Sequence, residues 1–418
     1  MEQENILGKE KIGKLILKFS IPCIVSMLVN SLYNIVDQIF IGQGVGTLGN
    51  GATNVVFPLV MIGLAFSLMF GDGASAYLSL KLGEKKKKEA EKGIGNGILL
   101  SAIVSIIFCV ITLIFLPQLL TLFGCTDKLR DLAMTYGRII AIGFPFSMIG
   151  TTLNSIIRAD GNPKYAMTSM VTGAILNTIL DPIFIFVFHK GVAGAAIATV
   201  FSQAVSMILC MIHLMKKGTI YQVELKKLHI DREMLGQIIR YGLPSGVQNS
   251  VIGFANVIVQ SNINSFGKVA MAAYGAYSKL EGFAFLPVTS FTMALTTFVG
   301  QNLGAGLHDR AKKGSRFGII ASVVIAEIIG VTMYLLAPQL VALFSPTPEV
   351  VELGARQMRT TALFFCLLAY SHAIASICRG AGKAFVPMVI MLLFWCVVRI
   401  AYITIVINAH VSFGSQPQ

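Results

Sequence analysis

The sequence has few charged residues. Lys, Arg, Asp and Glu make up only 13% of its 418 residues, whereas a soluble domain usually carries about 25%. Hydrophobic residues make up 55%, and the mean hydropathy is +0.74. This balance excludes an ordinary soluble domain and predicts a protein that crosses a membrane many times.

Cysteine pairs at metal-ligand spacing are also missing. None of the seven cysteines forms a CxxC motif, and nearly all lie in apolar segments, where cysteine behaves as a small hydrophobic residue. Neither a disulfide framework nor a zinc site is indicated. The sequence also lacks the motifs of zinc hydrolysis and nucleophilic catalysis, so we expect no cofactor and no enzymatic activity.

The excess of positive charge has a topological explanation. The formal net charge is +13, but no basic stretch is interleaved with aromatic residues as base stacking would require, so we expect no nucleic-acid partner. Lys and Arg concentrate in alternate loops, such as KLGEKKKKEAEK at 81–92 and RADGNPK at 158–164. The positive-inside rule therefore predicts a multi-pass protein of the plasma membrane with its N-terminus in the cytoplasm.

The hydrophobic segments predict an all-helical protein. A membrane span needs about 20 mostly apolar residues, and eleven segments meet this rule. They are 15–41, 52–80, 94–116, 132–156, 165–188, 191–215, 236–263, 270–299, 315–337, 353–377 and 384–408.

The two halves of the chain repeat each other. SIIRADGNPKYAM at 155–167 recurs as SICRGAGKAFVPM at 376–388, 221 residues later, and LPQLLTLF and APQLVALF share that offset. A repeat of six spans enters the membrane from the same side twice, which indicates a parallel repeat. We predict an N-terminal lobe at 1–215, a cytoplasmic linker at 216–235 and a C-terminal lobe at 236–418. The second lobe then has helices 7–11, and the twelfth helix of the plan is missing from this chain.

Polar residues inside the first lobe indicate a site. Asn177 and Asp181 lie four residues apart in the apolar segment AILNTILDPIFIFVF, on one face of a helix. An ionisable residue within the membrane is by default a functional candidate, although polar groups also join helices. Two carboxylates, two amides and a hydroxyl could hold sodium through oxygen ligands, or a proton. These residues are Asp37, Asn154, Asn177, Asp181 and Thr199.

Four further polar residues lie in predicted spans. Asn34 shares a helical face with Asp37, and Asp72 lies between two glycines in FGDGAS. In the second lobe, we expect Arg399 to pair with Glu281, with Glu327 as an alternative partner. Such a pair could stabilise the lobe or contact substrate.

These motifs resemble those of the multidrug and toxic compound extrusion (MATE) family of cation-coupled exporters, in particular its bacterial branches. The resemblance is carried by SIPCIVSMLVNSLYNIVDQIFIG at 20–42, by SIIRADGNPKYAM at 155–167, by GAILNTILDPIFIF at 173–186 and by GVAGAAIATVFSQ at 191–203. It implies a MATE-like fold of two six-helix lobes around a central cavity. It also implies a cation site at Asp37, Asn177 and Asp181, completed by Asn154 and Thr199.

The predicted function is secondary active antiport. We expect export of cationic or amphipathic drugs or metabolites, driven by protons or sodium ions, with sodium held at Asp37, Asn177 and Asp181. The expected partners are small organic cations and the lipid bilayer, and we expect a monomer. The first alternative is a lipid-precursor flippase of the same superfamily. The second is a membrane enzyme with Asp37 and Asp181 as an aspartic dyad, which the repeat argues against.

Overall fold

The computed structural model describes residues 10–216 and 230–414, and every regular element within them is a helix. An all-helical structure is expected for a chain of this hydropathy, because a helix satisfies its backbone hydrogen bonds internally where water is absent. The first half contains α2 Ile12–Val45, α3 Thr47–Gly83, α4 Lys87–Leu122, α5 Asp127–Ala159, α6 Pro163–Pro182, the π-helix η1 Ile183–Val187 and α7 Gly191–Met215.

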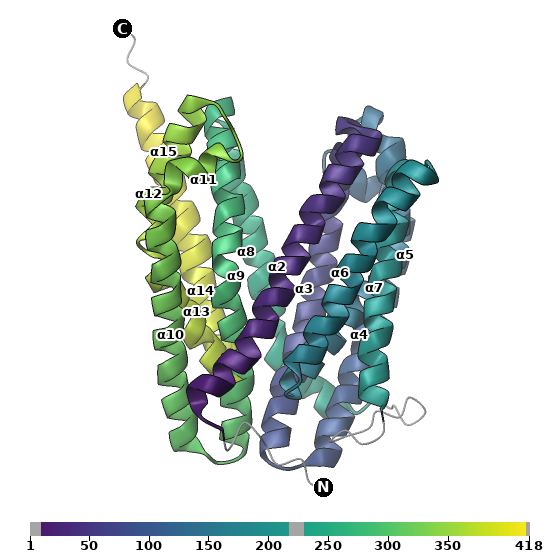
Figure 1. Ribbon diagram of the computed structural model, residues 1–418, viewed down its shortest axis with the longest axis vertical. Coiled ribbons are helices and arrows are strands. Elements are labelled where there is room, and N and C mark those ends of the chain that lie inside the picture. Colours follow the sequence, from purple (N-terminus) through teal and green to yellow (C-terminus); the bar gives the residue numbers. More distant parts are fainter. Residues whose placement is uncertain (1–9, 217–229, 415–418) are drawn as a thin grey trace.

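The second half repeats this order with more interruptions. It contains α8 Arg232–Asn264, α9 Lys268–Gly304, α10 His308–Leu335, α11 Ala337–Ala342, α12 Pro348–Ala362, α13 Phe365–Gly380, α14 Phe385–Leu392, the π-helix η3 Leu393–Val398 and α15 Arg399–Gly414. The two halves form two lobes, which stand side by side in Figure 1. The predicted two-lobe helical fold is confirmed.

The helices of the structure differ in detail from three of the predicted membrane spans. Nine helices of the described residues are long and apolar enough to cross a membrane, and α12 with α13 makes a tenth despite a bend of 52°. The segment predicted at 236–263 forms the helix α8. Its polar residues, among them Arg240 and Gln248, make α8 too polar to count among the helices that could cross a membrane. The segment predicted at 384–408 is interrupted by η3. Most of the predicted linker 216–235 lies outside the described residues, and α8 begins within that range, at Arg232.

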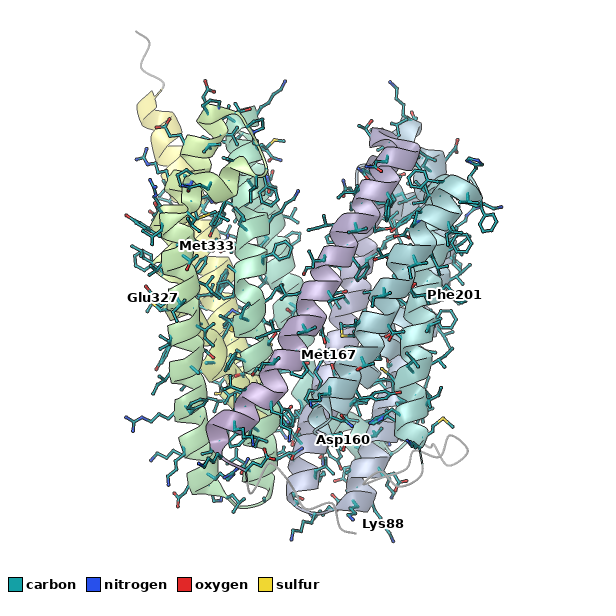
Figure 2. The ribbon with its side chains drawn as sticks, in the orientation of Figure 1. Lys88, Asp160, Met167, Phe201, Glu327 and Met333 are labelled. Carbon is teal, nitrogen blue, oxygen red and sulfur yellow. The ribbon has the colours of Figure 1, made fainter. Side chains whose placement is uncertain are left out.

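The basic loops gather at one end of the molecule. We call this the basic end; it carries the turns at 84–86, 160–162, 305–307 and 381–384, together with the start of α2. Figure 2 shows Lys88 and Asp160 toward this end, which lies at the bottom of both views.

Among the described residues, the lobes share a hydrophobic core only near the basic end. There, Leu15 and Phe19 of α2 pack with Phe298 of α9, and Ile238 of α8 packs into a cluster of first-lobe residues. The other two buried clusters each contain residues of one lobe alone. In Figure 1 the ribbons accordingly diverge toward the end opposite the basic loops.

Glycine permits the close contact between lobes. A Cβ atom on Gly242 of α8 would lie 1.7 Å from the carbonyl oxygen of Met69 on α3, and one on Gly304 of α9 would lie 2.1 Å from that of Leu80. No larger residue fits at such distances, because ordinary contacts begin near 3.4 Å. The backbones of α3, α8 and α9 therefore touch directly near the basic end.

Candidate functional site

Two buried carboxyl groups meet inside the first lobe. Asp37 on α2 is 7% exposed and Asp181 on α6 is 0% exposed, and the two groups lie within hydrogen-bonding reach of each other. Asn177 donates through Nδ2 to Asp181 Oδ1 at 3.2 Å and to Thr199 Oγ1 of α7 at 3.3 Å. Four of the five predicted coupling residues thus form one group, which we call the first-lobe cluster.

The local sequence explains how α2 and α6 approach each other. A Cβ on Gly44 would lie 2.2 Å from Cγ2 of Ile185 in η1, so glycine lets the end of α2 pack closely against this π-helix. Pro182 follows Asp181 and has no backbone N–H, which removes one helical hydrogen bond where α6 ends. Such π-turns are frequent at functional sites because they reposition neighbouring side chains.

The cluster has unsatisfied oxygen atoms. Asp37 Oδ1, Asp181 Oδ2 and Asn177 Oδ1 are buried and have no hydrogen-bond partner among the described residues. Two carboxylates in contact also repel each other when both are charged. A proton or a cation between them would satisfy the oxygens and remove the repulsion. An all-oxygen set suits a hard cation such as sodium, and the described residues contain no group of three or more His, Cys, Asp or Glu that could hold a metal.

The structure places Asn154 outside this cluster. Its Nδ2 donates to the carbonyl of Ala166 at 2.9 Å and to Ser169 Oγ at 3.3 Å, and its Oδ1 accepts from Arg158 at 2.7 Å. Ser169 precedes Asn177 on α6 by about 12 Å along the helix axis. The role of Asn154 as a direct ligand of the cation stays a prediction. These contacts do not support it, because its side chain makes its hydrogen bonds closer to the basic end.

Two of the further candidates lie outside the first-lobe cluster. Asn34 is exposed and donates to the carbonyl of Asn30 at 2.6 Å, so it is not enclosed with Asp37 although both lie on one face of α2. Asp72 lies between the lobes, on the part of α3 that contacts α8.

The expected direct ion pair of Arg399 is not formed among the described residues. Arg399 donates to Asn256 Oδ1 at 2.9 Å and lies 5.5 Å from the ring centre of Trp395. Glu281 accepts from the hydroxyl of Tyr277 at 2.7 Å and is only near enough for the charge of Arg399 to act on it. The alternative partner, Glu327, contacts Cys366 and lies on the outer flank in Figure 2.

Two neighbours of the cluster, Tyr33 of α2 and Tyr136 of α5, were missed by sequence reasoning, and the charges of Asp37 and Asp181 act on both. Tyr136 of α5 is 8% exposed and lies close enough to Asp37 and Asp181 for their charges to act on it. A tyrosine in an apolar span could have indicated these positions, because the hydroxyl of a buried Tyr usually has a hydrogen-bond partner nearby.

A duplicated helical fold whose lobes join at one end, with an acidic pair buried in one lobe, is an architecture expected of a membrane transporter. The MatE family model matches this chain twice, at residues 22–183 and 244–405. The chain therefore belongs to the MATE family of multidrug efflux transporters, as its motifs predicted, and it is a multi-pass membrane protein rather than an enzyme.

Individual relatives agree with this assignment. The chain is 25% identical over 379 residues to the probable multidrug resistance protein YoeA of Bacillus subtilis, covering 89% of this chain and 82% of YoeA. It is 26% identical over 386 residues to the multidrug export protein MepA of Staphylococcus aureus, covering 91% and 84%. A solved multidrug resistance MATE transporter in an outward-facing conformation has a TM-score of 0.89 at 25% identity, covering 96% of this chain and 90% of that one. These names favour drug export over the lipid-precursor flippase.

Proposed function

We propose that this protein exports cationic or amphipathic small molecules in exchange for protons or sodium ions that bind at the first-lobe cluster. One observation carries the proposal: Asp37 and Asp181 meet in a buried site that leaves three oxygens without partners. A structural staple between helices would use these oxygens in hydrogen bonds. A site that exchanges a cation must instead leave them available in one of its states.

The coupling follows from differential binding. A cation on the cluster draws α2 and α6 together, because it bridges a carboxylate from each helix. Substrate favours the other arrangement of the first-lobe helices. If each ligand binds the two arrangements with different affinity, transport of one ligand can drive transport of the other.

The distribution of Lys and Arg supports one orientation of the protein in the membrane. With the basic end in the cytoplasm, the N-terminus lies inside the cell, and the lobes are joined on the cytoplasmic side. We propose that the monomer is the transporting unit, and that the lobes extend over 1–215 and 236–418.

The test is ethidium uptake into everted membrane vesicles, energised separately by a proton gradient and by a sodium gradient. We expect one gradient to drive uptake by the wild type and Asp181→Asn to abolish the driven part, because the neutral amide cannot bind a proton or balance a cation. Asp131→Asn makes the same chemical change on an exposed part of α5 and should transport normally.

The outcomes separate the components of the proposal. The gradient that works identifies the coupling ion. Driven uptake by Asp181→Asn at the wild-type rate would exclude the first-lobe cluster as the coupling site. A folded wild type that moves no dye under either gradient would exclude this exporter activity.

A further inference from the structure

A buried hydrogen bond joins the two lobes at the basic end. Nε2 of Gln301, on α9 of the second lobe, donates to the carbonyl oxygen of Ala159, the last residue of α5 in the first lobe, at 2.7 Å. Gln301 is 3% exposed and Ala159 is 0% exposed. Neither partner is accessible to water while the lobes are in contact, so each depends on the other for its hydrogen bond.

The carbonyl of Ala159 lacks a backbone donor because of the local sequence. In a continuous helix it would accept from the N–H group four residues later, but that residue is Pro163, which has no N–H. The N–H groups of the three residues between them bond to earlier carbonyls of α5. The end of α5 therefore presents a buried acceptor that the second lobe satisfies.

The repeat shows that the two lobes can pack here without such an amide. A Cβ on Gly83 of α3 would lie 2.3 Å from the carbonyl oxygen of Gln301. The contact of Gly304 with the carbonyl oxygen of Leu80, at 2.1 Å, is its counterpart. The two glycines are 221 residues apart, and so are Leu80 and Gln301. The backbones thus meet as a symmetric pair, but the first lobe has a leucine where the second lobe has the amide.

We propose that Gln301 is a lock that holds the basic end closed by supplying the donor that the end of α5 lacks. When the lobes separate at this end, Gln301 moves away with the second lobe and water reaches both groups. A hydrogen bond between neutral groups is then exchanged for hydrogen bonds to water, which makes its net contribution small. The lock therefore favours the closed state and still leaves the open state accessible.

The inference rests on the proposed alternating access, but its test does not depend on transport. Spin labels at Lys88 and Asp309, on opposite lobes at the basic end, report closure through their distance in purified, cysteine-free protein without any gradient. Gln301→Met keeps the length of the side chain but has no N–H group. We expect it to raise the ratio of open to closed molecules about tenfold, because the buried carbonyl loses its donor in the closed state alone.

Three further variants separate the hydrogen bond from packing. Gln301→Leu gives α9 the residue that α3 has at the equivalent position, so it should fold and should open the basic end as Gln301→Met does. Leu80→Met changes a side chain of similar size at the same interface and leaves the hydrogen bond intact. Gln339→Met makes the same chemical change at an exposed position of α11, toward the opposite end. Both of these controls should keep the wild-type distance.

Three results would overturn the lock. They are a wild-type distance distribution in folded Gln301→Met, or a shift as large as that of Gln301→Met in either Leu80→Met or Gln339→Met. An unchanged distance in Gln301→Met, with gradient-driven dye uptake by the wild type, refutes the lock alone. A shifted distance in Gln301→Met, with no driven uptake by the wild type, keeps the lock and refutes the proposed function.

Discussion

The closed contact between α3 and α8 can be tested by adding a single methyl group. In Gly242→Ala, the new Cβ would lie 1.7 Å from the carbonyl oxygen of Met69, where an ordinary contact needs about 3.4 Å. The helices must therefore separate by about 1.7 Å near the basic end, or strain elsewhere must absorb the clash. Overpacking of this kind costs about 1–3 kcal/mol, and the cost is relieved in the state with separated lobes.

The same helix provides a matched control. A Cβ on Gly253 would have nothing within 4 Å, so Gly253→Ala gains the same helix propensity, about 1 kcal/mol, without the clash. With about 2 kcal/mol of overpacking, the open-to-closed ratio of Gly242→Ala should exceed that of Gly253→Ala by about 30-fold.

The assay is the distance between spin labels at Lys88 and Asp309, measured together with the thermal stability of each variant. We expect Gly242→Ala to broaden this distance toward larger values and Gly253→Ala to match the wild type. If Gly242→Ala has both the distances and the melting temperature of the wild type, the close contact of α3 with α8 is wrong.

Two further predictions concern the first lobe. Thr199→Val removes the hydroxyl that accepts a hydrogen bond from Asn177, so it should raise the coupling-ion concentration for half-maximal dye uptake about tenfold. Thr199→Ser keeps the hydroxyl and should stay near the wild type. Equal values for the two variants would exclude the hydroxyl from the site. Leu153→Ala, at a position with 0% exposure, should lower the free energy of unfolding by about 2 kcal/mol or more through the cavity it leaves. Ile107→Ala, at a position with 51% exposure, should have a much smaller effect in the same thermal-stability measurement, and equal losses would contradict the burial of Leu153.

The candidate site was predictable in part. Polar residues are rare in apolar spans, which points to Asp37, Asn177, Asp181 and Thr199, and the structure brings these four together. The same pattern points to Asn154, yet its hydrogen bonds join it to Arg158 and to the start of α6. Sequence spacing does not distinguish these cases, because the partners of a buried amide are set by how helices rotate and pack.

The sequence by itself determined the membrane-spanning helices and their repeat, since hydropathy and internal similarity can be read along the chain and a membrane requires apolar helices. Only the tertiary structure decided which parts of the two lobes are in contact. Met69 is 173 residues from Gly242 in the chain, and glycine at position 242 lets α8 touch the backbone of α3 there. Contacts of this kind depend on the approach of whole helices, which no local pattern encodes.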